Sequence, residues 1–249
     1  MIDIQLYNEN CKETLKRLPD GSIDLMLQDT PFGITQNDWD ISPNFSEMWP
    51  EWERVLKPNG VWLFFGTLPF AASLISSKLG FFRYDIVWQK SHPTGFLNAK
   101  RIPLRSHELI LVFYRSLPTY NPILTPKPKK DIRPDTGNSK KSTNYGSYNL
   151  APSRQAPTDL SYPKSIWKSN IDQNQIHPTQ KPVDLIRELI MTYSNKGETV
   201  FDGYSGSGTT AIACIKEQRN FIGSEINKDY FEKSIKRIQQ EKCQLVLAL

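Results

Sequence analysis

Two segments far apart in the chain each place an acidic residue directly after an apolar run. Asp29 follows the run 25–28 and begins an Asp-Thr-Pro-Phe turn over 29–32. Asp202 follows the run 199–201 and begins a turn rich in glycine. Parallel strands deliver functional loops to the carboxyl edge of an open α/β sheet in this way. We therefore expect both turns at one sheet edge, where they would bring a nucleoside-like cofactor to a planar substrate.

The acidic turn has the chemistry to activate an amino group conjugated to a heteroaromatic ring. Such a nitrogen is a poor nucleophile, because its lone pair is delocalised into the ring. The Asp29 carboxylate and a backbone carbonyl would accept its two N–H groups and free the lone pair, while Phe32 stacks on the ring. Attack on a methyl sulfonium then needs only orientation and electrostatics. Taken alone, the turn fits equally well an Asp that caps a turn and a Phe that fills the core.

The second turn contains Gly203, Gly206 and Gly208 between an expected strand and an expected helix. Glycine permits positive φ and lets a ligand approach the backbone, although many such turns only solve a packing problem. Glu225 ends the next expected strand about 20 residues later, where an acid can accept both ribose hydroxyls. The turn lacks the Gly-Lys-Ser/Thr ending of a phosphate-binding loop and the full Gly-x-Gly-x-x-Gly of dinucleotide binders. This pattern favours a nucleoside cofactor without phosphates.

The elements that must position these turns alternate between strands and helices. Hydrophobic periodicity predicts strands over 2–6, 23–27, 61–65, 84–88, 108–114, around 200 and over 221–223. It predicts helices over 11–18, 45–56, 69–79 and 186–193, from 208 onward, and at the end of the chain, with 57–60 ending the second helix. Repeated βα units imply a mostly parallel sheet with helices on both faces.

A basic segment interrupts this alternation. Residues 115–168 contain ten Lys or Arg, three Asp and no Glu, a net charge of +7. Since the whole chain carries +5, the remainder carries −2. The segment also contains eight prolines, so we interpret it as an irregular insertion. A localised positive patch is typical of a polyanion binder, and a merely solvated loop is the alternative.

Composition excludes several classes of protein. The chain has 249 residues, of which 38% are hydrophobic and 23% charged, as in globular proteins. No stretch approaches the roughly 18–20 apolar residues of a membrane span, and the first residues lack a signal-peptide pattern. Cys11, Cys214 and Cys243 are too scattered for a disulfide framework or a zinc site. We expect no metal site and a reducing, cytoplasmic location.

Together these motifs resemble the β-group of DNA amino-methyltransferases, which make N6-methyladenine or N4-methylcytosine from S-adenosylmethionine. In that group an Asp/Ser-Pro-Pro-Tyr/Phe turn comes early, a target-recognition region lies centrally, and a Phe-x-Gly-x-Gly loop comes late. The turn 29–32, the basic segment and the loop 201–210 follow this order, and His-Pro-Thr-Gln-Lys-Pro at 177–182 resembles the segment before the cofactor loop. The resemblance implies a doubly wound, mostly parallel Rossmann-like sheet with a circularly permuted motif order.

The resemblance also implies which residues form the sites. The catalytic residues would be Asp29, Thr30, Pro31 and Phe32. S-adenosylmethionine would be bound by Asn10, Asp29, His177, Thr179, Lys181, Asp202, Gly203, Tyr204, Gly206, Gly208, Thr209, Thr210 and Glu225. DNA phosphates would be bound by Lys100, Arg101, Lys127, Lys129, Lys130, Arg133, Lys140 and Lys141.

Four departures from the family pattern affect individual contacts. Thr30 replaces the usual first proline, which keeps the backbone carbonyl, and Phe32 replaces the commoner Tyr, which keeps the stacking ring. The stretch 203–205 differs from the usual Pro-Phe-Met-like sequence. Asn10 lies where the family often has an Asp near the cofactor adenine, and it would bond the adenine through its amide oxygen. None of these changes removes the acceptor Asp29, so we expect an active enzyme.

The resemblance divides the chain into a catalytic half over 1–114, a recognition insertion over 115–175 and a cofactor-binding half over 176–249. The expected substrate is double-stranded DNA, with the target base flipped into the pocket. An Asp in the catalytic turn favours adenine, and the alternatives are cytosine N4, RNA, or an inactive DNA-binding relative. We expect a bacterial or phage-encoded protein, for which a homodimer and a restriction endonuclease partner are both open alternatives. The amino-acid sequence does not predict the DNA sequence that is recognised.

Overall fold

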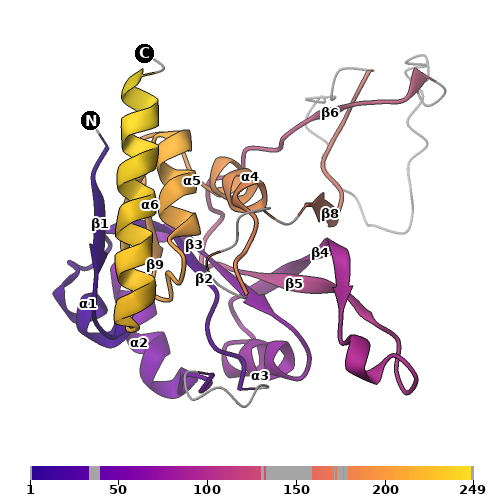
Figure 1. The fold of residues 1–249 in the computed structure, drawn as a ribbon, viewed down its shortest axis with the longest axis horizontal. Helices are drawn as coiled ribbons and strands as arrows, with labels where there is room; N and C mark the ends of the chain where they lie inside the picture. Colours follow the sequence, from indigo (N-terminus) through magenta and orange to yellow (C-terminus); the bar gives the residue numbers. More distant parts are fainter. Residues whose placement is uncertain are drawn as a thin grey trace. The chain divides into compact units, whose positions relative to one another are not determined.

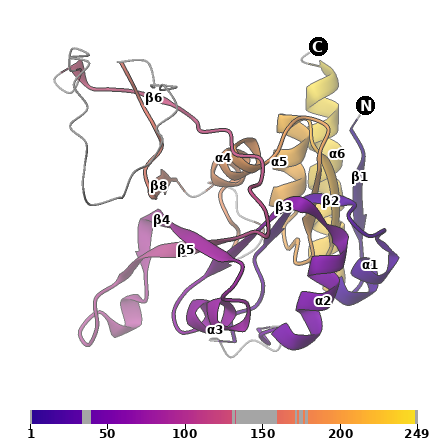
Figure 2. The same ribbon diagram turned by 180° about the vertical axis from the view of Figure 1, so that it is seen from behind.

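The computed structural model describes residues 2–33, 40–129, 132, 159–170, 172, 176 and 179–247. The chain divides into two compact units, one of residues 1–121 with 165–249 and one of residues 122–164. The larger unit is built on an eight-stranded sheet (Figures 1 and 2). In spatial order its strands are β1 (Ile4–Tyr7), β10 (Asn220–Ser224), β9 (Thr199–Asp202), β2 (Ile23–Gln28), β3 (Leu56–Gly66), β5 (Arg105–Phe113), β4 (Phe82–Thr94) and β8 (Ile166–Ser169).

Two hydrophobic clusters cover the two faces of this sheet. Alternate residues of one strand enter different clusters, since Val61 and Leu63 join one while Trp62 and Phe64 join the other. The first cluster includes side chains from α4 (Val183–Tyr193), α5 (Thr209–Glu217) and α6 (Lys228–Leu247). The second includes side chains from α1 (Cys11–Arg17), α2 (Phe45–Val55) and α3 (Phe70–Ser77). A strand buried on both faces reads as a continuous apolar run.

This arrangement confirms the predicted doubly wound, mostly parallel α/β fold. The neighbouring pairs β1–β10, β10–β9, β9–β2, β2–β3 and β4–β8 are parallel, whereas β5 is antiparallel to both of its neighbours. The first residues of β5 therefore lie at the edge of the sheet where the parallel strands end.

The two halves of the chain meet where β2 lies beside β9. Leu25 pairs with Val200 and Met26 with Phe201. At the end of β2 the Gln28 side chain donates to the Phe201 carbonyl at 3.2 Å and accepts the Gly203 N–H at 3.3 Å. This buried amide joins the strand before the acidic turn to the glycine turn.

Two sequence expectations differ from the structure. Residues 57–60 do not end a helix with a turn, because β3 already begins at Leu56, directly after α2. The irregular insertion predicted over 115–175 also contains β8, which pairs with β4 at the edge of the main sheet and buries Trp167. A strand of four residues is too short to produce a recognisable hydrophobic period.

The smaller unit, 122–164, contains an antiparallel pair of β6 (Thr125–Pro126) and β7 (Leu160–Ser161). The Lys127 N–H donates to the Asp159 carbonyl at 2.7 Å and extends this pairing. Across the described ranges of the whole chain, none of the helices combines the length and the apolar character that crossing a membrane requires.

Candidate active site

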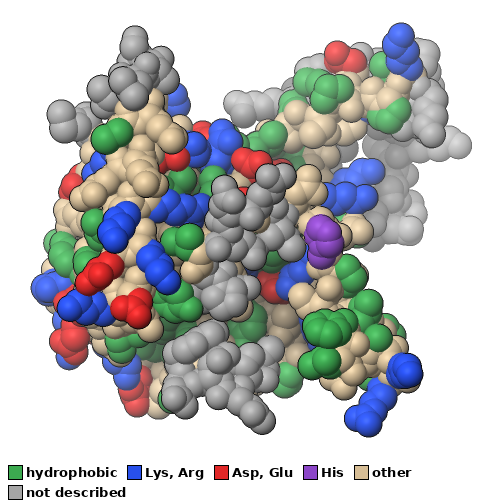
Figure 3. Space-filling model, in the orientation of Figure 1, with side chains coloured by type: hydrophobic (Ala, Val, Ile, Leu, Met, Phe, Trp, Pro, Cys, Tyr) green, Lys and Arg blue, Asp and Glu red, His purple; other side chains and the backbone are tan. Residues whose placement is uncertain are grey.

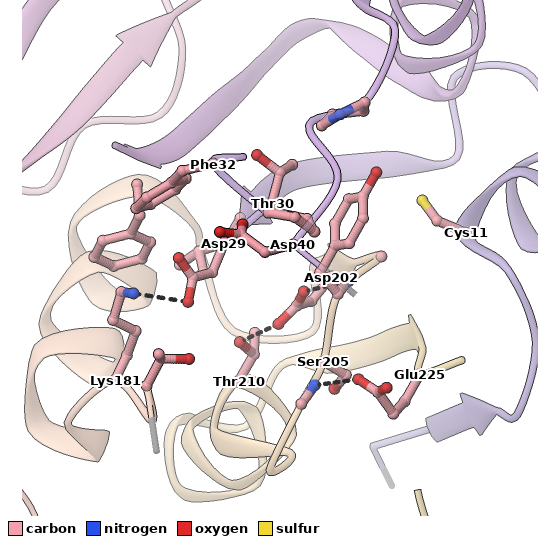
Figure 4. Close-up of a pocket in the computed structure, with 18 of the residues that line it drawn as sticks. Cys11, Asp29, Thr30, Phe32, Asp40, Lys181, Asp202, Ser205, Thr210 and Glu225 are labelled. Atoms are coloured by element: carbon pink, nitrogen blue, oxygen red, sulfur yellow. Dashed lines mark hydrogen bonds and ion pairs between the residues drawn. The ribbon is translucent and has the colours of Figure 1, made fainter. Parts of the chain in front are cut away.

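A cavity of about 940 Å³ opens where β2, β9 and β10 end, and both predicted turns line it (Figure 4). From the acidic turn the cavity is lined by Asp29, Thr30, Pro31 and Phe32. From the glycine turn and α5 it is lined by Asp202, Gly203, Tyr204, Ser205, Gly206, Ser207, Thr209 and Thr210. The structure therefore brings the two turns into one site, as the parallel-strand argument predicts.

Local contacts hold the acidic turn in shape. Gly33 has φ +67°, a conformation that L side chains rarely adopt, and its N–H donates to Asp40 Oδ1 at 2.9 Å. The Phe32 ring packs on Phe70 of α3, with ring centroids 4.8 Å apart. Thr30 is only 2% exposed, and its hydroxyl has no hydrogen-bond partner within the part of the chain that the structure describes. The turn thus places a carboxylate and an aromatic ring at the cavity.

Asp29 belongs to a mostly buried cluster of two carboxylates and two ammonium groups, in which its own side chain is the most exposed, at 24%. Lys181 Nζ lies 2.7 Å from Asp29 Oδ2, and Figure 4 shows the two side chains pointing toward each other. The same nitrogen lies 3.4 Å from Glu108 Oε2 at the start of β5. Lys90 of β4 forms an ion pair with the other carboxylate oxygen, Glu108 Oε1. The formal charges of the four groups sum to zero.

Burial and these ion pairs oppose each other in the cluster. Burial raises the pKa of Asp29 above its ordinary value, while the Lys181 ammonium acts to lower it. Burial would raise the pKa of Glu108, but Lys181 and Lys90 together lower it below its ordinary value. Burial would lower the pKa of Lys181, but Asp29 and Glu108 raise it, so this lysine stays protonated. Neutralisation within the cluster is what permits charges at this depth.

The glycine turn has the conformation that its residues predict. Gly206 and Gly208 have φ of +51° and +74°. A Cβ on Gly203 would overlap the Cys11 side chain of α1, so only glycine fits there. At the head of the turn, Asp202 accepts the Thr210 hydroxyl at 2.6 Å and the Tyr204 N–H at 3.0 Å. Burial raises the pKa of Asp202 to about 7.

Glu225 and α6 hold the glycine turn from its outer side. Glu225 accepts the Gly206 N–H at 2.8 Å, and burial raises the pKa of its carboxyl group. The Ser234 hydroxyl of α6 donates to the Gly206 carbonyl at 2.7 Å. Arg237, one turn further along α6, donates to the Ser207 carbonyl at 3.0 Å and to Thr209 Oγ1 at 3.1 Å. The backbone of the turn is therefore fixed before any ligand binds.

The cavity fits the predicted nucleoside cofactor. Its volume is in the range of small-molecule sites. The side chain of Ser205 is nearly buried, at 6% exposure, and its hydroxyl has no hydrogen-bond partner in the described ranges. Two carboxyl groups, Asp202 and Glu225, line the same wall and suit a ligand with hydroxyl and cationic groups. Among the described residues, no three His, Cys, Asp or Glu are grouped to hold a metal ion.

The other predicted cofactor residues have varied positions. Asn10 lines the cavity, but its Oδ1 accepts the Lys12 N–H at 2.9 Å and caps α1, so this oxygen is already bonded. Thr179 lines the cavity. Lys181 also does, and its ammonium is bound to the catalytic turn. Gly208 belongs to the turn but is not a lining residue, and His177 lies outside the described residues.

Of the predicted DNA-binding residues, Lys100 and Arg101 are described within the larger unit, and neither lines the cavity. Lys100 and Arg101 are exposed near the tip of the β4–β5 hairpin, where Figure 3 shows Lys and Arg side chains beside hydrophobic ones. The neighbouring Phe96 and Leu97 are also exposed. Lys127 and Lys129 belong to the smaller unit. Four further predicted residues lie outside the described ranges, namely Lys130, Arg133, Lys140 and Lys141.

Sequence reasoning missed several residues of the site. Glu108 and Lys90 were not predicted, because functional residues were expected only after the last residue of a strand. The antiparallel strand β5 instead brings its first residues to the edge where the parallel strands end. Ser234 and Arg237 were not predicted, because they bind the backbone of the glycine turn and the sequence of α6 contains no motif that marks them. The signal for Gln28 was present, since a polar residue ending a wholly apolar run needs a buried partner.

Comparisons with known proteins agree with this geometry. The family model N6_N4_Mtase, described as "DNA methylase", matches residues 23–237, most of the chain. The chain belongs to the DNA methylase family. The predicted family is thereby confirmed.

Individual DNA methylases match over most of the chain. Type II methyltransferase M.HpaI from Haemophilus parainfluenzae is 28% identical over 96% of this chain and 76% of its own length. DNA adenine methyltransferase YhdJ from Escherichia coli K12 is 28% identical over 90% of this chain and 79% of its own length. The crystal structure of the M1.HpyAVI–SAM complex matches with a TM-score of 0.62 and 27% identity, covering 94% of this chain and 99% of that one. The cofactor in that complex is the one that the sequence predicts.

Proposed function

We propose that this DNA methylase transfers a methyl group from S-adenosylmethionine to the exocyclic N6 of adenine in DNA. One observation carries the proposal. The carboxylate of Asp29 and the glycine turn around Gly206, which lie in opposite halves of the sequence, line the same cavity. A methyl donor held by the glycine turn and an amino group held by Asp29 would therefore share one enclosed space.

In this reaction Asp29 is the acceptor for one N–H of the target amino group. A bound cofactor would supply the methyl group on a sulfonium. The new bond would form to N6 as the carbon–sulfur bond breaks with its electron pair on sulfur, and the cationic N6 would then lose one proton to water. The negative charge of Asp29 stabilises the positive charge that develops on N6 during transfer. The backbone carbonyl of Thr30 would accept the second N–H, and the Phe32 ring would hold the base by stacking.

Two observations support adenine as the target base. An acidic residue, not a serine, begins the catalytic turn. A relative that matches 90% of this chain, YhdJ, is named a DNA adenine methyltransferase. Cytosine N4 is the alternative that product analysis would separate.

For the cofactor we propose that Asp202, Glu225 and the backbone of 203–210 surround the nucleoside. The hydroxyl of Ser205, which has no hydrogen-bond partner among the described residues, gives the turn a further group for the ligand. For Glu225, binding of ribose hydroxyls is compatible with its bond to Gly206, because each carboxylate oxygen accepts more than one hydrogen bond. Asn10 would accept the adenine amino group with the second lone pair of its Oδ1, while the same oxygen continues to cap α1.

For DNA we propose a recognition region over 115–175 between a catalytic half over 1–114 and a cofactor half over 176–249. The base must be flipped out of the duplex, at a cost of a few kcal/mol. The basic residues of the region, with Lys100 and Arg101 on the β4–β5 hairpin, would offset this cost by binding phosphates. We also propose that the protein acts in the cytoplasm, where a second copy of the chain and a restriction endonuclease are partners to test.

The decisive experiment measures methyl transfer to genomic DNA from a strain without DNA methyltransferases. Tritium from labelled S-adenosylmethionine should enter this DNA, and nucleoside analysis should find N6-methyladenine. N4-methylcytosine would identify the alternative base, and label in single-stranded DNA or RNA alone would change the substrate class.

Substitution of the acceptor tests its role in the same assay. Asp29→Ala should lower the transfer rate by at least about 100-fold, because the developing charge loses its partner. Cofactor affinity, measured by calorimetry, should stay close to that of the wild type. Comparable turnover in the variant would refute the role of Asp29.

A further inference from the structure

The carboxylate oxygen Oε2 of Glu108 is an unused acceptor beside the catalytic turn. Glu108 is 9% exposed, and within the described residues this oxygen forms an ion pair with Lys181 but accepts no hydrogen bond of favourable geometry. Buried carboxylate oxygens are normally satisfied, because an unpaired one forfeits its solvation without compensation. The nearest cation is the Lys181 ammonium at 3.4 Å, which is instead hydrogen-bonded to Asp29 at 2.7 Å.

The surroundings allow Lys181 to move between the two carboxylates. Lys90 holds the other oxygen of Glu108, so the orientation of this carboxylate is fixed. The Lys181 ammonium lies between aromatic rings, 4.9 Å from the centroid of Phe65 and 5.9 Å from that of Phe32. These rings attract the cation without fixing its direction. The separation of 3.4 Å is already within hydrogen-bond distance, so a change in the direction of the ammonium group would complete the bond to Glu108.

We propose that Glu108 is a positioning residue, which takes over the Lys181 ammonium when the target amino group donates its hydrogen bond to Asp29. This proposal rests on the proposed methyl transfer. Before the base enters, Lys181 neutralises Asp29 and occupies the oxygen that the substrate needs. When the base enters, Lys181 turns to Glu108 Oε2, and the freed Asp29 oxygen accepts the N–H. Lys181 stays close enough to keep the site neutral throughout.

The first test is Glu108→Gln, which keeps the shape of the side chain and removes its charge. With a weaker alternative acceptor, Lys181 should stay on Asp29 and compete with the substrate. We expect kcat/KM for unmethylated genomic DNA to fall roughly 10- to 100-fold, the effect of one charge-assisted hydrogen bond. Cofactor affinity should stay unchanged, whereas the melting temperature should fall somewhat, because Lys90 and Lys181 lose a buried counter-charge.

The pH profile separates positioning from a merely structural role. The charged groups that face Asp29 are Lys181, Glu108 and Lys90, with Asp202 on the neighbouring strand, and Arg105 also lines the cavity. Glu108→Gln removes a negative charge, which lowers the pKa of Asp29, so the acidic limb of the rate profile should move to lower pH. Lys181→Met removes a positive charge, so the same limb should move to higher pH.

A double-mutant cycle tests whether Glu108 acts through Lys181. In a Lys181→Met background, Glu108→Gln should cause little further loss of rate, because no ammonium remains to be relocated. Independent, additive losses would overturn the proposal. If Lys181→Met does not fold, Glu108→Asp decides the question. It keeps the charge but withdraws the oxygen by one carbon–carbon bond, so the rate should fall while the acidic limb stays in place.

Glu53→Gln is the matched control, since Glu53 pairs with Lys78 away from the cavity. It should leave the rate and its pH profile unchanged. Absence of methyl transfer by the wild-type protein to every nucleic acid would refute the proposed function. An active wild type with a fully active Glu108→Gln variant and an unmoved acidic limb would refute only the role of Glu108.

Discussion

A buried carboxyl group at Asp202 links the stability of the site to pH. Its pKa of about 7 in the folded protein compares with an ordinary value of 3.8. The protonated form is thus favoured by folding. The stabilisation is complete below about pH 4 and is lost as the pH rises through 7, at most about 1.4 kcal/mol for each pH unit crossed.

Asp202→Asn should remove this dependence, because the amide does not titrate. The free energy of unfolding of the variant, measured by urea denaturation from pH 5 to pH 8, should increase relative to that of the wild type as the pH rises. The Asn side chain keeps an oxygen for the Tyr204 N–H, and its amide nitrogen can donate to the Thr210 hydroxyl, so the two proteins should be similarly stable at pH 5. A difference between the two proteins that is independent of pH would contradict the buried, protonated carboxyl group.

For single residues, the sequence predicts which side chains carry the chemistry better than it predicts which residues those side chains bond to. Asp29, Asp202 and Glu225 each follow an apolar run, so the sequence alone predicts that they meet at one edge. The bond between Lys181 and Asp29 joins residues 152 positions apart, and no local pattern encodes it. Asn10 shows the reverse case, since a helix-capping Asn and a ligand-binding Asn look alike in the sequence.

Among the elements, α6 determines the shape of the glycine turn. Arg237 of α6 also lies 3.8 Å from Asp172, which accepts the Gln180 side chain at 2.9 Å. It thereby connects the turn to the segment before α4. Arg237→Met should weaken cofactor binding about 5- to 10-fold, because the turn loses the hydrogen bonds that fix it before binding.

Calorimetric titration with S-adenosylmethionine would measure this effect. The control is Lys236→Met, an exposed neighbour on the same helix. Equal affinities for the two variants would show that the turn keeps its shape without Arg237.

The strands show why part of the sheet was predictable and part was not. Long apolar runs such as 61–65 identify central strands, and the βα alternation implies parallel neighbours. The antiparallel direction of β5 follows from the hairpin connection over 95–104 that joins it to β4, and no period in the sequence reveals this direction. The short edge strand β8 depends on pairing with β4 more than on its own residues.

On the scale of the whole molecule, charge is divided unevenly along the chain, and DNA binding should reflect this. Residues 115–168 carry +7 and the rest −2. If the segment binds phosphates, the logarithm of the DNA association constant should fall linearly with the logarithm of salt concentration. Replacing both Lys127 and Lys129 by Gln should reduce that slope by about two, one for each lost phosphate contact.

Fluorescence anisotropy with labelled duplex DNA over a series of NaCl concentrations would measure the slope. The matched control replaces Lys236 and Lys242 of α6, which are exposed and lie outside the basic segment. A slope that falls equally in both double variants would indicate only a general effect of net charge.

The side-by-side placement of β2 and β9 has a consequence for synthesis of the protein on the ribosome. Gln28 and Phe201, whose strands must touch to close the site, are 173 positions apart. At a synthesis rate of about 5–20 residues per second, the catalytic carboxylate emerges roughly 10 to 35 s before the turn that would receive the cofactor. A nascent chain therefore carries an inert half-site until β9 and the glycine turn have been synthesised, and release before that point yields no active enzyme.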